Sequence, residues 1–247
     1  MRYESMNLII DIGNSRMKVV AIEGMEILGT EVCESLDTKW LRHVVSLYPK
    51  AYRAILSSTR GEVEQVEATL RECIDSVISF RPGITPSPIG NDYLTPTTLG
   101  ADRLAAAVGA AALYPDSDIM IVDFGTAITI DYVENGIFKG GNISPGMTTR
   151  FRALADYTAS LPLCSASDEQ LSYGRTTQQA IEQGVMQGIT HEIEGYIEAF
   201  SKKKGKKYII FTGGDAKYFA MRIKNAIFAD CEPVVYGLSR ILDYNAV

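Results

Sequence analysis

The sequence predicts an α/β protein built from two similar halves. Each half opens with three short strand-like segments and continues into helical spacing. The first strand of each half ends in the same phrase: a carboxylate, one more residue, a glycine and a small polar residue. The two phrases begin at Asp11 and Asp123, 112 residues apart (123 − 11). At 247 residues and 46% hydrophobic, the chain can bury one large core or two smaller ones.

The first half alternates strands and helices over its whole length. We expect a turn at Glu23-Gly24 and a loop over 82–96, which is rich in Pro, Gly, Ser and Thr. The last helix of this half is alanine-rich and nearly all apolar, so we expect it to be buried. The predicted strands cover 8–12, 17–22, 26–32, 54–57 and 76–80, and the predicted helices cover 38–48, 63–73 and 104–113.

The second half repeats this opening. Its hairpin signal is Glu134-Asn135-Gly136. The predicted strands cover 119–123, 126–133, 137–142 and 207–211, and the predicted helices cover 148–157, 178–200, 215–223 and 236–245. We place the domain boundary near residues 114–117, which gives halves 1–115 and 116–247. Ligands of open α/β sheets lie beyond the carboxyl ends of strands, so we expect a nucleotide between the halves.

Composition excludes several classes of function. The net charge of −6 argues against a nucleic-acid binder. No apolar stretch approaches the ~20 residues of a membrane span, and the first residues do not resemble a signal peptide. The four cysteines are scattered without a C-x-x-C pair, and there are two histidines, so we expect no zinc site. Reduced thiols favour a cytoplasmic protein.

The two carboxylate phrases predict a site for phosphate and a cation. A carboxylate at the end of an apolar strand is costly to bury unless a charged group meets it. Glycine lets the backbone approach a ligand, and the small polar residues and backbone amides can donate to phosphate oxygens. The carboxylate can hold a cation directly or through water. A turn at a polar strand end is the alternative, and the repetition argues against it. The first phrase comprises Asp11, Ile12, Gly13, Asn14, Ser15, Arg16, Met17 and Lys18, and the second runs from Asp123 through Thr126 to Asp131.

A third motif, Gly100-Ala101-Asp102-Arg103, lies where the loop meets the apolar helix. Asp102 is a candidate general base. Arg103 is a candidate clamp for an anion, because guanidinium suits carboxylate or phosphate. Taken alone, the motif fits better with an ordinary helix N-terminus, where aspartate is favoured for capping and dipole reasons.

Three further segments contain residues suited to close ligand approach. The glycines of 140–146 and of Thr212-Gly213-Gly214 can bring backbone near a ligand, or form a tight turn and a helix cap. Thr176-Thr177 precedes the long helix and can cap it or donate a hydroxyl to a substrate. The chain has no P-loop, dinucleotide-binding or nucleophile-elbow motif.

In this order, the motifs resemble those of the type III pantothenate kinases, in the acetate kinase, sugar kinase, heat-shock 70 and actin superfamily. The resemblance covers most of the chain. Asp11 to Lys18 matches the first phosphate motif, with Ser15 in place of threonine, and Asp123 to Asp131 matches the second. It implies two ribonuclease H-like (actin-like ATPase) halves with the nucleotide cleft between them.

The resemblance also implies roles for individual residues. Asp102 would be the general base. Asp123 would bind a monovalent cation, K⁺ or NH₄⁺, and Asp11 would hold Mg²⁺ through water. The implied pantothenate-binding residues are Tyr93, Gly100, Ala101, Asp102, Arg103 and Thr177, and the implied ATP-binding residues are those from Asp11 to Lys18 with Thr126, Gly213 and Gly214. A homodimer is implied as well.

The resulting hypothesis is ATP-dependent phosphorylation of pantothenate, the first step of coenzyme A biosynthesis. One alternative is another kinase or a phosphatase of the same superfamily, which would lack Tyr93 together with Gly100-Ala101-Asp102-Arg103. A second alternative is a regulator without catalytic activity, against which the intact Asp11, Asp102 and Asp123 argue. A nucleotide-gated chaperone would need a peptide-binding domain for which the chain has no room.

Overall fold

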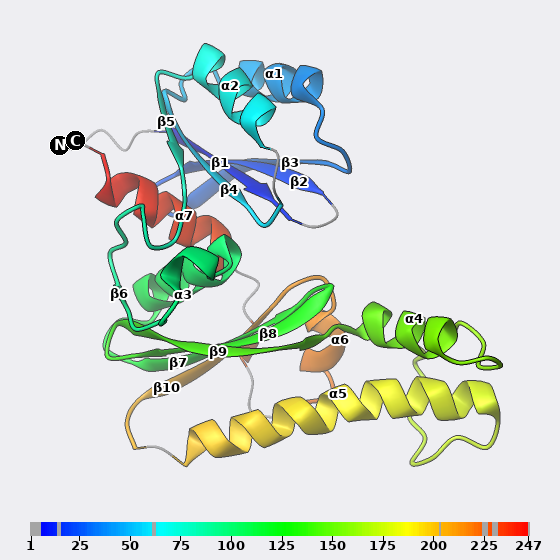
Figure 1. Ribbon diagram of the computed structural model, residues 1–247. Helices are drawn as coiled ribbons and strands as arrows, with labels where there is room; N and C mark the ends of the chain where they lie inside the picture. The colour runs from blue at the N-terminus through cyan, green and yellow to red at the C-terminus, as the bar shows by residue number, and fades with distance from the viewer. Residues whose placement is uncertain are drawn as a thin grey trace. The chain divides into compact units, whose positions relative to one another are not determined.

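The chain forms two compact units in the computed structural model, which describes residues 6–13, 16–60, 63–202, 204–223, 227–228 and 232–246 (Figure 1). The first unit comprises Met1–Pro115, Gly136–Lys139 and Glu232–Val247, and the second comprises Asp116–Asn135 and Gly140–Cys231. The predicted boundary between halves 1–115 and 116–247 coincides with the change from the first unit to the second after Pro115. The compact units differ from them in two segments, 136–139 and 232–247, which lie with the first unit.

A mixed five-stranded sheet forms the centre of the first unit, in the order β3-β2-β1-β4-β5. The first three strands form antiparallel hairpins, and β4 and β5 run parallel to β1. The strands are β1 (Met6–Ile12), β2 (Met17–Glu23), β3 (Glu26–Cys33), β4 (Arg53–Ser58) and β5 (Ser76–Ser79). Because β1 is central, the residue at its carboxyl end, Asp11, is held by strands on both sides.

Helices cover both faces of this sheet. On one face, α1 (Thr38–Leu47) and α2 (Glu64–Cys73) pack over alternate residues of β1, including Leu8 and Ile10. The other helices that contact β1 or β4 are α3 (Ala101–Leu113) and α7 (Pro233–Tyr244), which also pack against each other. The alanine-rich helix is therefore buried, as its composition predicts.

The second unit repeats the strand order. Its sheet runs β11-β10-β7-β8-β9, and the short β6 pairs with the start of β9, in the part of that strand that belongs to the first unit. Here β7 is the central strand, antiparallel to β8 and parallel to β10. The strands are β6 (Gly90–Asn91), β7 (Asp118–Phe124), β8 (Ala127–Glu134), β9 (Ile137–Pro145), β10 (Lys207–Thr212) and β11 (Ile227–Phe228).

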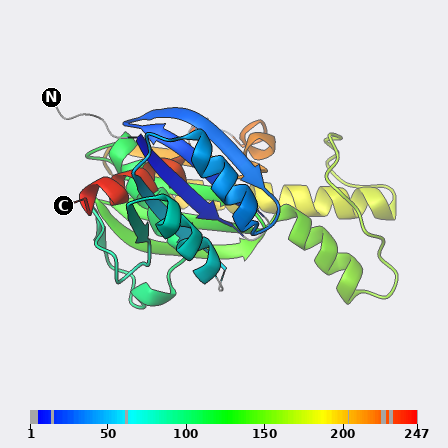
Figure 2. The ribbon, with the colours of Figure 1, turned by 90° about the horizontal axis from the view of Figure 1, so that it is seen from above.

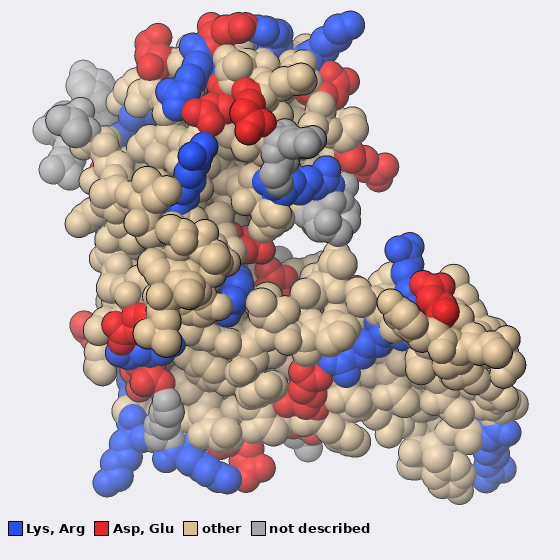
Figure 3. Space-filling view, in the orientation of Figure 1, with Lys and Arg blue, Asp and Glu red and all other residues tan. Residues whose placement is uncertain are grey.

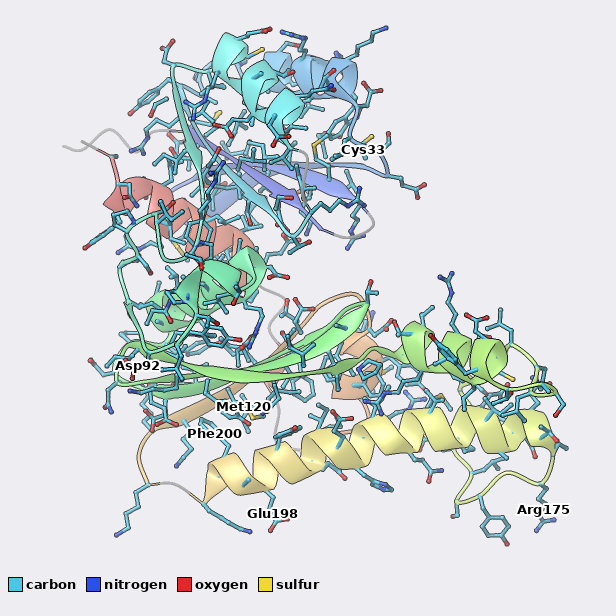
Figure 4. All side chains as sticks on the ribbon, in the orientation of Figure 1. Cys33, Asp92, Met120, Arg175, Glu198 and Phe200 are labelled. Atoms are coloured by element: carbon cyan, nitrogen blue, oxygen red, sulfur yellow. The ribbon has the colours of Figure 1, made fainter. Side chains whose placement is uncertain are left out.

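The long helix α5 (Thr177–Ser201) covers one face of this second sheet, and Met120 and Phe200 meet in the core between them (Figure 4). Its N-terminal end and α4 (Met147–Tyr157) extend past the strands (Figure 2). Few charged side chains cover this end (Figure 3). The remaining helical segments are η1 (Pro96–Thr98) and α6 (Ala216–Ala220).

The shared strand order confirms the predicted fold class of two ribonuclease H-like units. The element bounds differ in places. The C-terminal helix begins at Pro233, three residues before the prediction, because proline is well suited to the first helical position. The helix predicted through residue 223 ends at Ala220. The two-residue strands β6 and β11 are too short to give a periodic signal.

Candidate active site

The first phosphate phrase forms the tight hairpin between β1 and β2. Gly13 N donates to Arg16 O at 3.0 Å, and Asp11 lies directly opposite Lys18 in the antiparallel ladder. Cross-strand partners place their side chains on the same face of a sheet, so these two charges are neighbours. Ile12 and Met17 are buried in the core, so they could meet a ligand only through the backbone. Asn14 and Ser15 lie outside the described residues.

The Asp11 carboxyl group lies in a buried and electrostatically unusual position. Its pKa is raised from 3.8 to about 6, chiefly by burial and also by the Asp102 carboxylate, while Lys18 opposes the rise. Its Oδ1 atom is buried without a hydrogen-bond partner. An unpartnered carboxylate oxygen beside a phosphate-type hairpin fits a cation or its water. No cluster of three metal-ligating side chains occurs among the described residues, but Mg²⁺ needs only one or two carboxylates when phosphate supplies further ligands.

Asp102 lies in the first turn of α3, where Gly100 is the N-cap. Its Oδ1 accepts a hydrogen bond from Arg103 N at 2.8 Å, which fixes the direction of the carboxyl group. Burial raises the pKa of Asp102, and the neighbouring Arg103 limits this rise. A raised pKa makes a carboxylate a stronger proton acceptor when it is ionised, as a general base requires.

Arg103 is almost fully buried and lies beside two aromatic rings that also contact each other. Its guanidinium carbon is 5.8 Å from the ring centre of Tyr93 and 5.9 Å from that of Phe138, within the range of cation–π attraction. The rings are held by the pairing of β6 with β9. An ion pair of 2.7 Å between Lys139 Nζ and Asp92 Oδ2 flanks this pairing, and Figure 4 shows Asp92 at the same edge.

The sequence pattern did not identify two residues of the candidate site, Phe138 and Glu232. Phe138 gave no signal because a phenylalanine in a strand is an ordinary core residue. Glu232 pairs with Lys18, and both carboxylate oxygens lie 2.9 Å from Nζ. No local pattern could join them, because 214 residues separate them along the chain.

The second phosphate phrase forms the matching hairpin of the second unit. Asp123 ends β7 and pairs in register with Thr212, so the strand end of β10 lies beside it. Gly213 follows with φ = 94°, a conformation that favours glycine. A Cβ at Gly213 would collide with Asp123 Oδ1 and lie 2.7 Å from Phe124 N. Because Gly213 has no side chain, its backbone can pack directly against the Asp123 carboxylate.

The glycine-rich segment that ends β9 packs against the same hairpin. Gly146 N donates to Thr126 O at 3.0 Å, and Thr149 Oγ1 donates to that oxygen at 2.7 Å. Thr126 is itself exposed. Asp123, Thr126, Gly213 and Gly214 therefore lie at one end of the second sheet.

Thr177 is the first residue of α5 and is exposed. The preceding Thr176 is the helix cap, and its Oγ1 accepts from Gln179 N at 3.1 Å. The capping alternative thus applies to Thr176, and the Thr177 hydroxyl remains a candidate substrate contact. Both residues belong to the second unit, whereas the residues of the Asp102 motif belong to the first.

Solved structures with the same fold include nucleotide-binding proteins. The activator of 2-hydroxyisocaproyl-CoA dehydratase from Clostridium difficile, solved with bound ADPNP, has a TM-score of 0.55 and 16% identity, covering 96% of this chain and 93% of its own. A Campylobacter jejuni protein described as a Baf family transcriptional activator has a TM-score of 0.62 and 22% identity, covering 96% and 98%. The fold is that of the actin-like ATPases.

The sequence comparison narrows this class to one family. The model of the type III pantothenate kinase family matches residues 7–199. The type III pantothenate kinase of Azobacteroides pseudotrichonymphae is 42% identical over 241 residues, which cover 97% of each chain. The chain belongs to the type III pantothenate kinase family. Within the described part of the chain, no helix has the length and apolar character needed to cross a membrane.

Proposed function

We propose that this protein transfers the γ-phosphoryl group of ATP to the primary hydroxyl of pantothenate, giving 4′-phosphopantothenate, the first step of coenzyme A biosynthesis. Family membership supports the reaction. The observation that carries the assignment of residues is the buried Asp11 Oδ1 atom without a hydrogen-bond partner, with the Asp102 carboxylate near enough to raise the pKa of Asp11. Asp11 suits a cation that is bound to phosphate, and Asp102 suits the proton of the substrate hydroxyl.

In this proposal Asp102 accepts the proton of the attacking hydroxyl. Its orientation by the Arg103 amide supports this role, because a base must be aimed at the proton that it removes. Arg103, held beside the rings of Tyr93 and Phe138, anchors the pantothenate carboxylate. Gly100 and Ala101 shape the start of α3, and Thr177 supplies a hydroxyl. Positioning and charge neutralisation carry most of the barrier reduction in phosphoryl transfer.

The ATP contacts are proposed for the 11–18 hairpin of the first unit and for Thr126, Gly213 and Gly214 of the second. Lys18 supplies a positive charge to phosphate oxygens. Mg²⁺ would neutralise phosphate charge beside Asp11, whose unpartnered Oδ1 supports this placement. K⁺ or NH₄⁺ would bind at the Asp123 carboxylate, which the backbone of Gly213 approaches closely.

The activity is tested by ADP release with ATP, Mg²⁺ and pantothenate, measured in potassium and again in sodium. We expect ADP release to require pantothenate and to fall sharply in sodium. Turnover that is equal in the two salts would reject the cation role of Asp123 and leave the kinase assignment standing. Absence of turnover in either salt, with folded protein that binds ATP, would reject the kinase assignment.

We further propose a cytoplasmic homodimer. The end of the second unit around α4 and the start of α5 exposes large apolar side chains, and few charges surround them in Figure 3. They include Tyr157, Leu163 and Tyr173, which are 90%, 66% and 68% exposed. An apolar surface with few charges is typical of an interface between copies. We expect Leu163→Asp to convert dimer to monomer in sedimentation equilibrium, whereas Leu47→Asp, at an equally apolar exposed site on α1, leaves the dimer intact.

A further inference from the structure

The interaction between Lys18 and Glu232 is an ion pair inside the proposed phosphate site. Lys18 is the last residue of the first phosphate phrase, and both Glu232 oxygens contact its ammonium group at 2.9 Å. The two side chains are 20% and 39% exposed, so solvent reaches the pair. A carboxylate that holds a lysine through two oxygens presents a negative charge and oxygen acceptors, as a phosphate group also does.

The backbone at Glu232 is fixed by its neighbours. Pro233 restricts the residue before it to extended conformations, and Glu232 has φ = −95° and ψ = 83°. Its side chain makes no capping hydrogen bond to α7, although it occupies the N-cap position. The carboxylate is therefore presented by a rigid start of α7 and is not needed to begin that helix.

Electrostatics gives a second, independent reason to place Glu232 in the site. Glu232 and Asp102 both raise the pKa of Asp11, and Lys18 lowers it. Lys18 and, more weakly, Arg16 thus oppose three carboxylates of the first unit at this position. A phosphate group that arrives here competes with Glu232 for Lys18, and the Glu232 charge then lies near a second anion.

We propose that Glu232 is a competing anion that occupies Lys18 when no nucleotide is bound and takes it back when ADP leaves. This inference rests on the proposed function, because it assumes that Lys18 binds phosphate. Glu232 acts on the nucleotide through Lys18, so it is a positioning residue. Its charge weakens nucleotide binding and favours product release.

The test is the affinity for MgATP and MgADP without pantothenate, measured by isothermal titration calorimetry on the full chain. We expect Glu232→Gln to bind both nucleotides roughly three- to fivefold more tightly, since a solvent-exposed ion pair of this kind contributes modestly. Glu232→Asp keeps the charge and should remain close to wild type. In turnover, KM for ATP should fall in Glu232→Gln while KM for pantothenate stays unchanged.

Asp243→Asn is the matched control. Asp243 lies on the same helix, is also 39% exposed and pairs with Arg53 at 2.7 Å. Asp243→Asn removes one negative charge, as Glu232→Gln does, but from a residue that pairs with Arg53 and not with Lys18. We therefore expect nucleotide affinity to stay at the wild-type value. If Glu232→Gln were to unfold, Glu232→Ala replaces it, because the side chain is not part of the helix cap.

Two results would overturn the inference. Unchanged affinity in Glu232→Gln would mean that Glu232 does not compete with phosphate. Weaker affinity, restored by Glu232→Asp, would mean that Glu232 holds Lys18 in place for ATP. A wild-type protein that binds MgATP but does not phosphorylate pantothenate would reject the proposed function and leave this comparison of affinities valid. Absence of MgATP binding by wild type would reject both.

Discussion

Asp102 combines burial, a fixed orientation and coupling to Asp11. If it is the general base, Asp102→Asn should keep binding of ATP and pantothenate and lose turnover by about 10²–10⁴-fold, the usual contribution of a positioned base. Binding is measured by calorimetry and turnover by ADP release. Near-normal turnover would remove Asp102 from the base role, and lost pantothenate binding would make it chiefly a substrate contact.

The raised pKa of Asp11 predicts a cost in stability. Its pKa is 3.8 when unfolded and about 6 when folded, so the folded protein binds the proton more tightly. Stability therefore falls as pH rises from about 4 to about 6, and the loss is complete above 6. We expect Asp11→Asn to be more stable than wild type by roughly 2–3 kcal/mol at pH 7 without Mg²⁺ and nucleotide. The advantage should disappear near pH 4.

Urea denaturation at several pH values measures this difference. Asp243→Asn, which removes a carboxylate outside the hairpin, serves as the control and should show no such gain at pH 7. An Asp11→Asn protein less stable than wild type at pH 7 would show that a favourable interaction of the carboxylate outweighs its burial.

At single positions, the sequence located the groups that end strands or begin helices. Asp11, Asp102 and Asp123 stand out because a carboxylate beside an apolar run is conspicuous. Glu232 and Phe138 do not stand out, because their importance comes from contacts with Lys18 and Arg103 that only the folded chain creates. Local pattern identifies an unusual residue, but it does not report a partner from another part of the chain.

At the scale of elements, the contact between α3 and α7 holds the first unit together. The helices meet at Gly109 and Gly237, where the backbones approach closely. A Cβ at Gly109 would collide with Pro233 O and lie 2.9 Å from Gly237 N. The alanine-rich sequence predicts that α3 is buried, since small side chains let another element come near, but it does not identify α7 as that element.

This contact predicts the effect of one methyl group. Gly109→Ala should destabilise the protein by about 1–3 kcal/mol. The added methyl group meets backbone atoms of α7, which cannot rotate away as a side chain can, so the two helices must move apart. Gly195→Ala is the control. It adds the same group to α5 at a place with no atom within 4 Å, and should stabilise by up to about 1 kcal/mol.

Thermal and urea unfolding of the two variants measure these effects. Because α3 carries Asp102 in its first turn and α7 begins beside Glu232, we also expect Gly109→Ala to lower kcat. Equal stability of Gly109→Ala and wild type would mean that the two helices can separate without cost.

At the scale of the whole molecule, the sequence predicted two halves, and the strand order of both sheets follows that prediction. What the duplication did not reveal is that the first unit is discontinuous. Its last helix comes from the far end of the chain, because a helix joins the face where its apolar side finds a partner. In α7 that side comprises Val235, Leu238, Ile241 and Leu242, all at most 1% exposed.

This topology predicts how fragments fold. The chain 1–115 lacks α7 and so exposes the surfaces of α3, β1 and β4 that this helix contacts. Burial of four such side chains contributes roughly 1.5–3 kcal/mol each, as much as the whole stability of a typical domain. We expect 1–115 alone to lack a cooperative urea transition. The same chain joined to 232–247 through a flexible linker of about 20 residues should show one.

Circular dichroism during urea titration distinguishes the two fragments. Leu238→Asp in the joined fragment is the control, because it keeps the added length and removes the apolar contact, and it should abolish the transition. Cooperative unfolding of 1–115 by itself would mean that the predicted half is self-sufficient and that α7 only adds to it. Glu232, the N-cap of α7, pairs with Lys18, so the segment that completes this unit also places a negative charge at its phosphate hairpin.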